Sequence, residues 1–129
     1  MNLLDEQMRQ DQRALLTRWG IPFRQIGREI ASSGIQDADI IPFLQTLKRP
    51  TFFTHDQGFF RSSLAHLHYC LVWLDVSDIE AAAYIRRFLR HPAFNTYARR
   101  MGHVARANIE GVQYWQLGRA RKNFVQWPE

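Results

Sequence analysis

At 129 residues, of which 46% are hydrophobic and 22% charged, the chain has the size and composition of one globular domain, which excludes a disordered protein. No apolar run approaches the roughly 20 residues that cross a bilayer, and acids stand near the N-terminus where a signal peptide has bases, so we expect a cytoplasmic protein with no membrane partner. The single Cys70 excludes an internal disulfide, and the net charge of +5 favours a polyanionic partner.

The N-terminal part of the chain predicts a strand, a helix and a second strand. Residues 1–4 are apolar and break at Asp5 and Glu6, which predicts a short strand that ends on carboxylates. Apolar residues then recur at helical spacing over residues 8–19, and a glycine and a proline follow to end the helix. Residues 23–26 predict the second strand, although an arginine and a glutamine interrupt it.

The central part predicts a helix that begins near Asp37 or Asp39 and a buried strand that ends before Asp56. Apolar residues over 40–47 follow the i, i+3, i+4, i+7 pattern, and either aspartate is a suitable N-cap. The strand that begins at Thr51 buries two phenylalanines. Because an isolated buried carboxylate is very costly, Asp56 must lie at the strand end, in water or on a cation.

Residues 69–74 form an unbroken apolar run, which predicts a parallel strand covered on both faces and followed by Asp75. Ser77 and Glu80 have the spacing of a capping box and predict a helix over residues 81–90. A strand followed in this way by a helix is the repeating unit of a parallel sheet.

The C-terminal part departs from this alternation. A short helix is expected over residues 96–101, and residues 103–117 alternate as a β-hairpin that turns at a Glu-Gly pair. The last residues are basic and have no pattern that assigns them to an element. We therefore expect one domain over residues 1–117 and a basic C-terminal tail over residues 118–129.

Strands that alternate with helices predict the α/β class, with a mainly parallel central sheet flanked by helices and a C-terminal β-hairpin. Sites in such sheets form at the carboxyl ends of the strands, which is where Asp5, Asp56 and Asp75 fall. Carboxylates without a cysteine or multi-histidine motif favour Mg²⁺ or Mn²⁺ over zinc. The acids thus predict a divalent-metal site, and strand-end turns and helix caps are the alternative explanation.

Positive charge is concentrated in the C-terminal part of the chain. Residues 1–80 hold ten acids and eight bases, whereas residues 81–129 hold two acids and nine bases. Arginine supplies fifteen of the seventeen bases, and its planar fork suits phosphate oxygens. A nucleic-acid backbone, an acidic protein and solvent alone are the alternative partners of these side chains. The candidate nucleic-acid-binding residues are Arg86, Arg87, Arg90, Arg99 and Arg100.

Three short motifs resemble those of the short prokaryotic PIN-like proteins, relatives of the PIN-domain ribonucleases that include many toxins. The motifs are Leu3-Leu-Asp-Glu6, Asp37-Ala-Asp-Ile40, and Thr54-His-Asp56 followed by Gly58-Phe59. The resemblance implies a PIN-like three-layer fold over residues 1–117 and an endoribonuclease that uses Mg²⁺ or Mn²⁺. It also implies RNA as the substrate and an antitoxin protein as a partner, and it is compatible with a homodimer.

The same resemblance implies individual roles. The metal ligands would be Asp5, then Asp37 or Asp39, and then Asp56. Glu6, Thr54 and His55 are supporting candidates from the residues themselves: Thr54 either orients the Asp56 carboxylate by a hydrogen bond or only fills a strand, and His55 either assists a proton transfer or is an exposed polar neighbour. The chain departs from the family at Gly58, where relatives often carry a further acid, and Asp75 is the candidate substitute.

We therefore expect Asp5, Asp39 and Asp56 to be catalytic in a metal-dependent endoribonuclease, with Asp37 as the alternative to Asp39. Gly58 favours a second hypothesis, a catalytically degenerate PIN-like module that binds RNA or a protein. The third hypothesis is a small α/β interaction protein whose acids serve only as caps and turns.

Overall fold

A seven-stranded sheet organises the protein, whose computed structural model describes all residues from 1 to 129. The strands are β1 Asn2–Leu4, β2 Arg24–Gln25, β3 Thr51–Thr54, β4 Cys70–Leu74, β5 His103–Ala107, β6 Gly111–Gln116 and β7 Asn123–Gln126. Their spatial order is β2-β1-β3-β4-β5-β6-β7. Neighbours from β2 to β5 run parallel, whereas β6 and β7 join antiparallel, so the sheet is mainly parallel.

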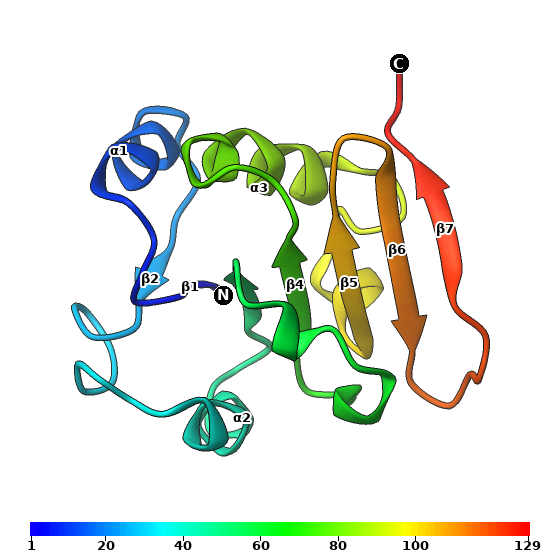
Figure 1. Cartoon of the computed structure of the whole chain (residues 1–129), viewed down its shortest axis with the longest axis horizontal. Coiled ribbons are helices and arrows are strands. Elements are labelled where there is room, and N and C mark those ends of the chain that lie inside the picture. The colour runs from blue at the N-terminus through cyan, green and yellow to red at the C-terminus, as the bar shows by residue number, and fades with distance from the viewer.

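Helices flank the sheet, which confirms the expected α/β class. They are α1 Gln10–Arg18, α2 Asp37–Gln45, α3 Ala81–Arg90 and α4 Tyr97–Arg100, with the 3-10 turns η1 Gln57–Phe59, η2 Ser62–Leu64 and η3 Asp78–Glu80. Helices α1 and α3 lie side by side, and α2 lies away from them (Figure 1). None of these helices combines the length and the apolar character that crossing a bilayer requires.

Two neighbouring side chains of β3 show how the sheet separates two apolar cores. Phe53 belongs to the core that contains Leu16 of α1 and Phe88 of α3, whereas Phe52 belongs to the core that contains Leu44 of α2. All of these side chains are fully buried. Because successive strand residues point to opposite faces, a strand with an apolar pair of this kind is stable only when both faces are covered.

The starts of two helices differ from the predicted caps. Gln36 precedes α2 and makes no side-chain cap bond, and Asp37 and Asp39 both lie in the first turn of the helix. Ser77 also makes no cap bond, because η3 separates it from the start of α3 at Ala81. Capping therefore does not account for the carboxylates at the start of α2.

Residues 118–129, which the sequence pattern set apart as a tail, contribute β7 to the edge of the sheet (Figure 1). A Cβ atom at Gly111 would lie 2.3 Å from the Val125 carbonyl oxygen, so glycine allows β6 and β7 to approach closely. Trp127 is 9% exposed, and its Nε1–H donates to the Asn108 carbonyl oxygen at 2.6 Å. These contacts make the last residues part of the domain.

Candidate functional site

The carboxyl ends of β1 and β3 meet where the strand order reverses. From β1 the chain passes through α1 on one face to β2, and then through α2 on the other face to β3 on the opposite side of β1. The two connections diverge and leave a crevice beyond the strand ends, which is the usual ligand position in open α/β sheets. Asp5 follows β1 and Asp56 lies beyond β3, so both border this crevice.

Thr54 joins the two strand ends through its hydroxyl group. Its side chain is fully buried, its Oγ1 donates to Asp5 Oδ2 at 2.6 Å, and the same oxygen accepts the Asp56 backbone N–H at 3.0 Å. We expected Thr54 to orient the Asp56 carboxylate, but it orients Asp5 because β1 and β3 are adjacent. The Asp56 carboxylate is oriented instead by the Gly58 N–H, which donates to Oδ1 at 2.8 Å.

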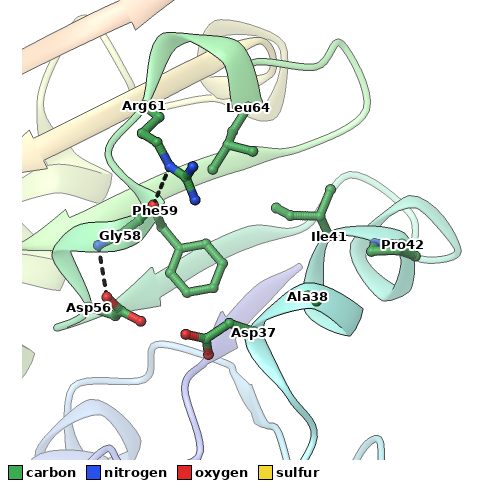
Figure 2. A pocket seen from close by; sticks show the side chains of 9 residues that line it. All are labelled: Asp37, Ala38, Ile41, Pro42, Asp56, Gly58, Phe59, Arg61 and Leu64. Atoms are coloured by element: carbon green, nitrogen blue, oxygen red, sulfur yellow. Dashed lines mark hydrogen bonds between the residues drawn. The ribbon is translucent and has the colours of Figure 1, made fainter.

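Asp37 brings a third carboxylate to the crevice from the first turn of α2. Figure 2 shows the side chains of Asp37 and Asp56 approaching each other at a cavity. A hydrogen bond with Asp56 raises the pKa of Asp37, and desolvation and the negative charges of Asp56 and Asp5 raise it further. These carboxylates therefore repel one another when all are ionised. We call Asp5, Asp37 and Asp56 the acidic cluster.

No cation of the protein neutralises the acidic cluster. The ion pairs in the structure join Arg9 to Asp11 and Asp78, and Arg106 to Asp75. The donor set, which consists of carboxylates without a thiolate, matches the oxygen ligands that Mg²⁺ and Mn²⁺ take. In the conformation described, no three acidic, histidine or cysteine side chains lie close enough together to hold one ion.

Two cavities share Asp37 and Asp56 as a common wall. The larger has a volume of about 510 Å³ and lies between α2 and the segment that follows β3 (Figure 2). The smaller has a volume of about 330 Å³ and is lined by Asp5. Arg61 is the only arginine or lysine that lines either cavity, and its Nε–H donates to the Gly58 carbonyl oxygen at 2.9 Å. The crevice thus combines carboxylates that suit a cation with one guanidinium that suits a phosphate.

Two predicted acids lie outside the acidic cluster. Asp75 accepts hydrogen bonds of 2.6 and 2.9 Å from Arg106, so it does not substitute for the acid absent at Gly58. Asp39 is exposed on α2 and lines neither cavity. The structure therefore corrects our preference for Asp39 and places Asp37 in the cluster.

Two further residues hold the loop that carries Asp5. Glu6 accepts hydrogen bonds from the Ser33 hydroxyl and, at 2.8 Å, from the Gly34 N–H, and both bonds lower its pKa. Gln25 is fully buried, and its Nε2 donates to the carbonyl oxygens of Asp5 and Glu6 at 3.1 Å. The role of Gln25 was not predicted; its signal was a polar amide that, with Arg24, interrupts the strand expected over residues 23–26.

His55 also lines the smaller cavity. Its Nδ1 lies 3.0 Å from the Leu74 carbonyl oxygen, and because a carbonyl only accepts, Nδ1 carries a proton. In the neutral ring Nε2 is then an acceptor, and it is buried without a hydrogen-bond partner. Such an unpartnered buried nitrogen is uncommon in proteins, and here it belongs to a residue that lines the same cavity as Asp5, Asp37 and Asp56.

The arginine predicted to bind nucleic acid at position 100 is a buried structural residue. Arg100 is 5% exposed, and it donates to Thr51 Oγ1 at 3.0 Å and to the Phe94 carbonyl oxygen at 2.8 Å. Thr51 begins β3, whereas Asp56 lies beyond its end, so Arg100 and the acidic cluster lie at opposite ends of the strand. Arg99 donates to a carbonyl oxygen in the segment that follows α3. Burial therefore corrects the expected role of Arg100.

The remaining predicted arginines belong to α3. The Arg86 guanidinium lies 3.7 Å from the centroid of the Trp19 ring, and the Arg87 guanidinium lies 4.5 Å from that of Trp127. Arg90 is exposed at the end of the helix. None of the three lines either cavity at the acidic cluster.

The fold and the site define an open α/β protein with a carboxylate-lined crevice at the switch point of its sheet. No protein-family model, curated protein or solved structure matches the chain. The resemblance to PIN-like proteins rests on the three motifs, and the chemistry of the site is inferred from its own residues.

Proposed function

We propose that the protein is a divalent-metal-dependent endoribonuclease of PIN-like type, in which the acidic cluster holds Mg²⁺ or Mn²⁺. The observation that supports this proposal is the convergence of Asp5, Asp37 and Asp56 on one cavity without a neutralising cation, and the raised pKa of Asp37 agrees with it. A divalent cation would relieve their repulsion once the side chains close around it, since hard ions take several carboxylate oxygens and the three carboxylates do not lie close enough to hold an ion in the conformation described. The sheet order adds support by analogy of fold, because sites in such sheets lie beyond β1 and β3.

The residues around the acidic cluster would have distinct roles in this reaction. A bound ion would supply a water of lowered pKa and stabilise charge on the phosphate. Thr54 would keep the Asp5 carboxylate in place, and Arg61 would meet a phosphate oxygen at the cavity. His55, which lines the smaller cavity, would assist a proton transfer.

Thermal unfolding in the presence of Mn²⁺ tests the metal site. Free Mn²⁺ at 100 times its Kd would stabilise the folded protein by about 2.7 kcal/mol. Asp37→Asn should abolish the rise in Tm, whereas Asp39→Asn, which removes the same charge two residues further along α2, should retain it. A wild-type protein without any rise in Tm, or two variants that behave alike, would contradict the assignment.

Incubation with single-stranded RNA tests the reaction. Cleavage should occur with Mn²⁺ and stop with EDTA, and it should be lost in Asp5→Asn and Asp56→Asn. Asp39→Asn serves as the matched control and should cleave at the wild-type rate. Cleavage that survives substitution of both Asp5 and Asp56 would reject the proposed site.

The second candidate is a degenerate PIN-like module that binds RNA or a protein without cleavage. Gly58 favours it, because this position often carries an acid in the proteins that the chain resembles. A Cβ atom there would lie 3.0 Å from Asp56 Oδ1, so a larger side chain would displace that carboxylate slightly. RNA binding without Mn²⁺-dependent cleavage would favour this candidate. An antitoxin that covers the cavity is a partner expected under the first candidate only.

A further inference from the structure

A row of side chains crosses the sheet from the acidic cluster to the outer edge. The register partners in this row are Thr54 of β3, Trp73 of β4, Arg106 of β5, Gln113 of β6 and Phe124 of β7. Partners in register point to the same face of a sheet, so these side chains form one line. We call this line the cross-sheet row, and Figure 1 shows β4 to β7 side by side along its course.

No helix covers the outer part of this face. Helices α1 and α3 pack on the opposite face, where Val72 and Ala105 lie in the core. Helix α2 belongs to the other core, which contains Leu3 of β1 and Phe52 of β3 and extends to Leu71 of β4 and Val104 of β5. The side chains of Trp73 and Gln113 are half-buried, and that of Phe124 is 46% exposed. The part of this face that carries the cross-sheet row is therefore partly open to solvent.

Aromatic rings and cations alternate on this open face. The Phe60 ring centroid lies 5.8 Å from that of Trp73 and 6.5 Å from that of Trp115. The Lys122 Nζ lies 6.0 Å from the Phe60 centroid and 5.5 Å from that of Trp115. The Arg106 guanidinium lies 4.9 Å from the Trp73 centroid. Such spacing places a positive charge beside each flat ring.

The connection between β6 and β7 contributes positive charge only. Residues 111–128 contain three bases, all exposed, and no aspartate or glutamate. The charge of Arg106 is compensated by Asp75, whereas Lys122 forms no ion pair and keeps its charge available. A ligand of this face must therefore present negative charge together with flat apolar surfaces.

We propose that the open face over β4 to β7 binds a single strand of nucleic acid, with bases stacked on Trp73, Trp115 and Phe124 and phosphates near Lys122. Proteins that bind single strands combine aromatic platforms with basic grooves in this way. A duplex hides its base faces, and the aspartate and glutamate side chains of an acidic polypeptide have no flat rings to stack. The inference rests on the proposed function, because the cross-sheet row leads to Thr54 and the acidic cluster, where the strand would be cleaved.

Fluorescence anisotropy with a labelled oligouridine of about 12 nucleotides, which is within the usual site size, tests this face. EDTA in the buffer removes any contribution from bound metal. Trp115→Leu should raise Kd by about fivefold to a hundredfold, the effect of losing one stacked base. Trp115→Phe keeps a ring and should restore most of the affinity, and circular dichroism verifies that both variants fold.

The two lysines of the chain provide a matched pair for the charge contribution. Lys122→Gln should reduce the slope of log affinity against log salt by about 0.7, the value for one phosphate contact on a single strand. Lys48→Gln removes the same charge from an exposed position in the segment that follows α2, and it should leave the slope unchanged. Equal effects of the two substitutions would overturn the inference.

Further outcomes separate this inference from the proposed function. Equal affinity for duplex RNA, or displacement by polyglutamate as readily as by RNA, would overturn the inference. Unchanged affinity of Trp115→Leu in a protein that still cleaves RNA would overturn it and leave the nuclease intact. A further outcome is a protein that binds RNA in EDTA through Trp115 and Lys122 but neither cleaves RNA nor shows a rise in Tm with Mn²⁺. That result would support the inference and reject the nuclease.

Discussion

The hydroxyl group of Thr54 connects the two strand ends on which the site depends, and Thr54→Val removes it with almost no change in shape. In the wild type this group donates to Asp5 Oδ2 at 2.6 Å and accepts the Asp56 N–H at 3.0 Å. Valine fills the same buried volume but forms neither bond. The substitution therefore isolates the contribution of two hydrogen bonds to the free energy of unfolding.

The expected loss follows from the types of bond. A hydrogen bond to a charged group contributes about 1.5–3 kcal/mol and one between neutral groups about 0.5–1.5 kcal/mol, so both bonds together give about 2–4.5 kcal/mol. Asp5 and Asp56 are half-buried, which lets water replace part of the lost bonding. We therefore expect a loss near the lower limit, about 2 kcal/mol.

Urea denaturation measures this loss. With an m-value of about 2 kcal/mol/M, the midpoint should fall by about 1 M at constant m. Thr54→Ser keeps the hydroxyl and should lose only the contribution of one buried methyl group, about 1 kcal/mol. In an Asp5→Ala background, Thr54→Val should cost less, because one of its two bonds is already absent. A Thr54→Val protein as stable as the wild type, or an equal cost in both backgrounds, would refute the coupling between Thr54 and Asp5.

Three further substitutions test other parts of the structure. Arg100→Met should lower the free energy of unfolding by about 2–3 kcal/mol, because Thr51 Oγ1 loses its buried donor. RNA binding should be unchanged. Weakened RNA binding by a folded variant would instead favour the expectation from the sequence that Arg100 binds nucleic acid. Burial lowers the pKa of His103 below 6.5, so the folded state disfavours the charged form of its ring. The free energy of unfolding should therefore rise as the pH rises toward 6.5, and it should fall as the pH falls and the ring becomes protonated. Denaturation at several pH values should show a smaller gain from acid to neutral pH in His103→Gln, and an identical profile would contradict the burial effect. Gly111→Ala should cost more than about 1 kcal/mol and increase hydrogen exchange in β7, because the new methyl group meets the Val125 carbonyl oxygen; unchanged exchange would contradict the close approach.

Much of the fold was predictable because the pattern of apolar and polar residues within each segment determines the helix or strand that forms there. Apolar runs followed by acids predicted strands at residues 1–4 and 69–74 and one that begins at Thr51, and the structure has β1, β3 and β4 there. The helix predicted over residues 81–90 matches α3, whose apolar face is fully covered. Burial of one periodic face decides such elements, and periodicity is written in the chain itself.

Elements without a local cause were not predictable. β7 has no distinctive alternation, and its place in the sheet depends on pairing with β6 across the close approach at Gly111. The hydroxyl of Thr54 was assigned to the nearest carboxylate in sequence, Asp56, although its partner is Asp5, which is 49 residues away. Strand adjacency in space, which no short pattern encodes, decided both outcomes.

The residue types of the site, and the position of Asp5 and Asp56 beyond strand ends, were determined by the chain alone, because ionised carboxylates cannot enter an apolar core. Tertiary structure decided which acids meet. Asp37 and Asp39 are two residues apart and hence about 200° apart around a helix, so only the packing of α2 directs one of them toward Asp56. Asp75 follows a strand as Asp5 and Asp56 do, but Arg106 from the neighbouring strand forms an ion pair with it, so Asp75 is not part of the cluster. A charged side chain pairs with the opposite charge that is nearest in the folded structure. The number of residues between the two along the chain does not determine which charge that is.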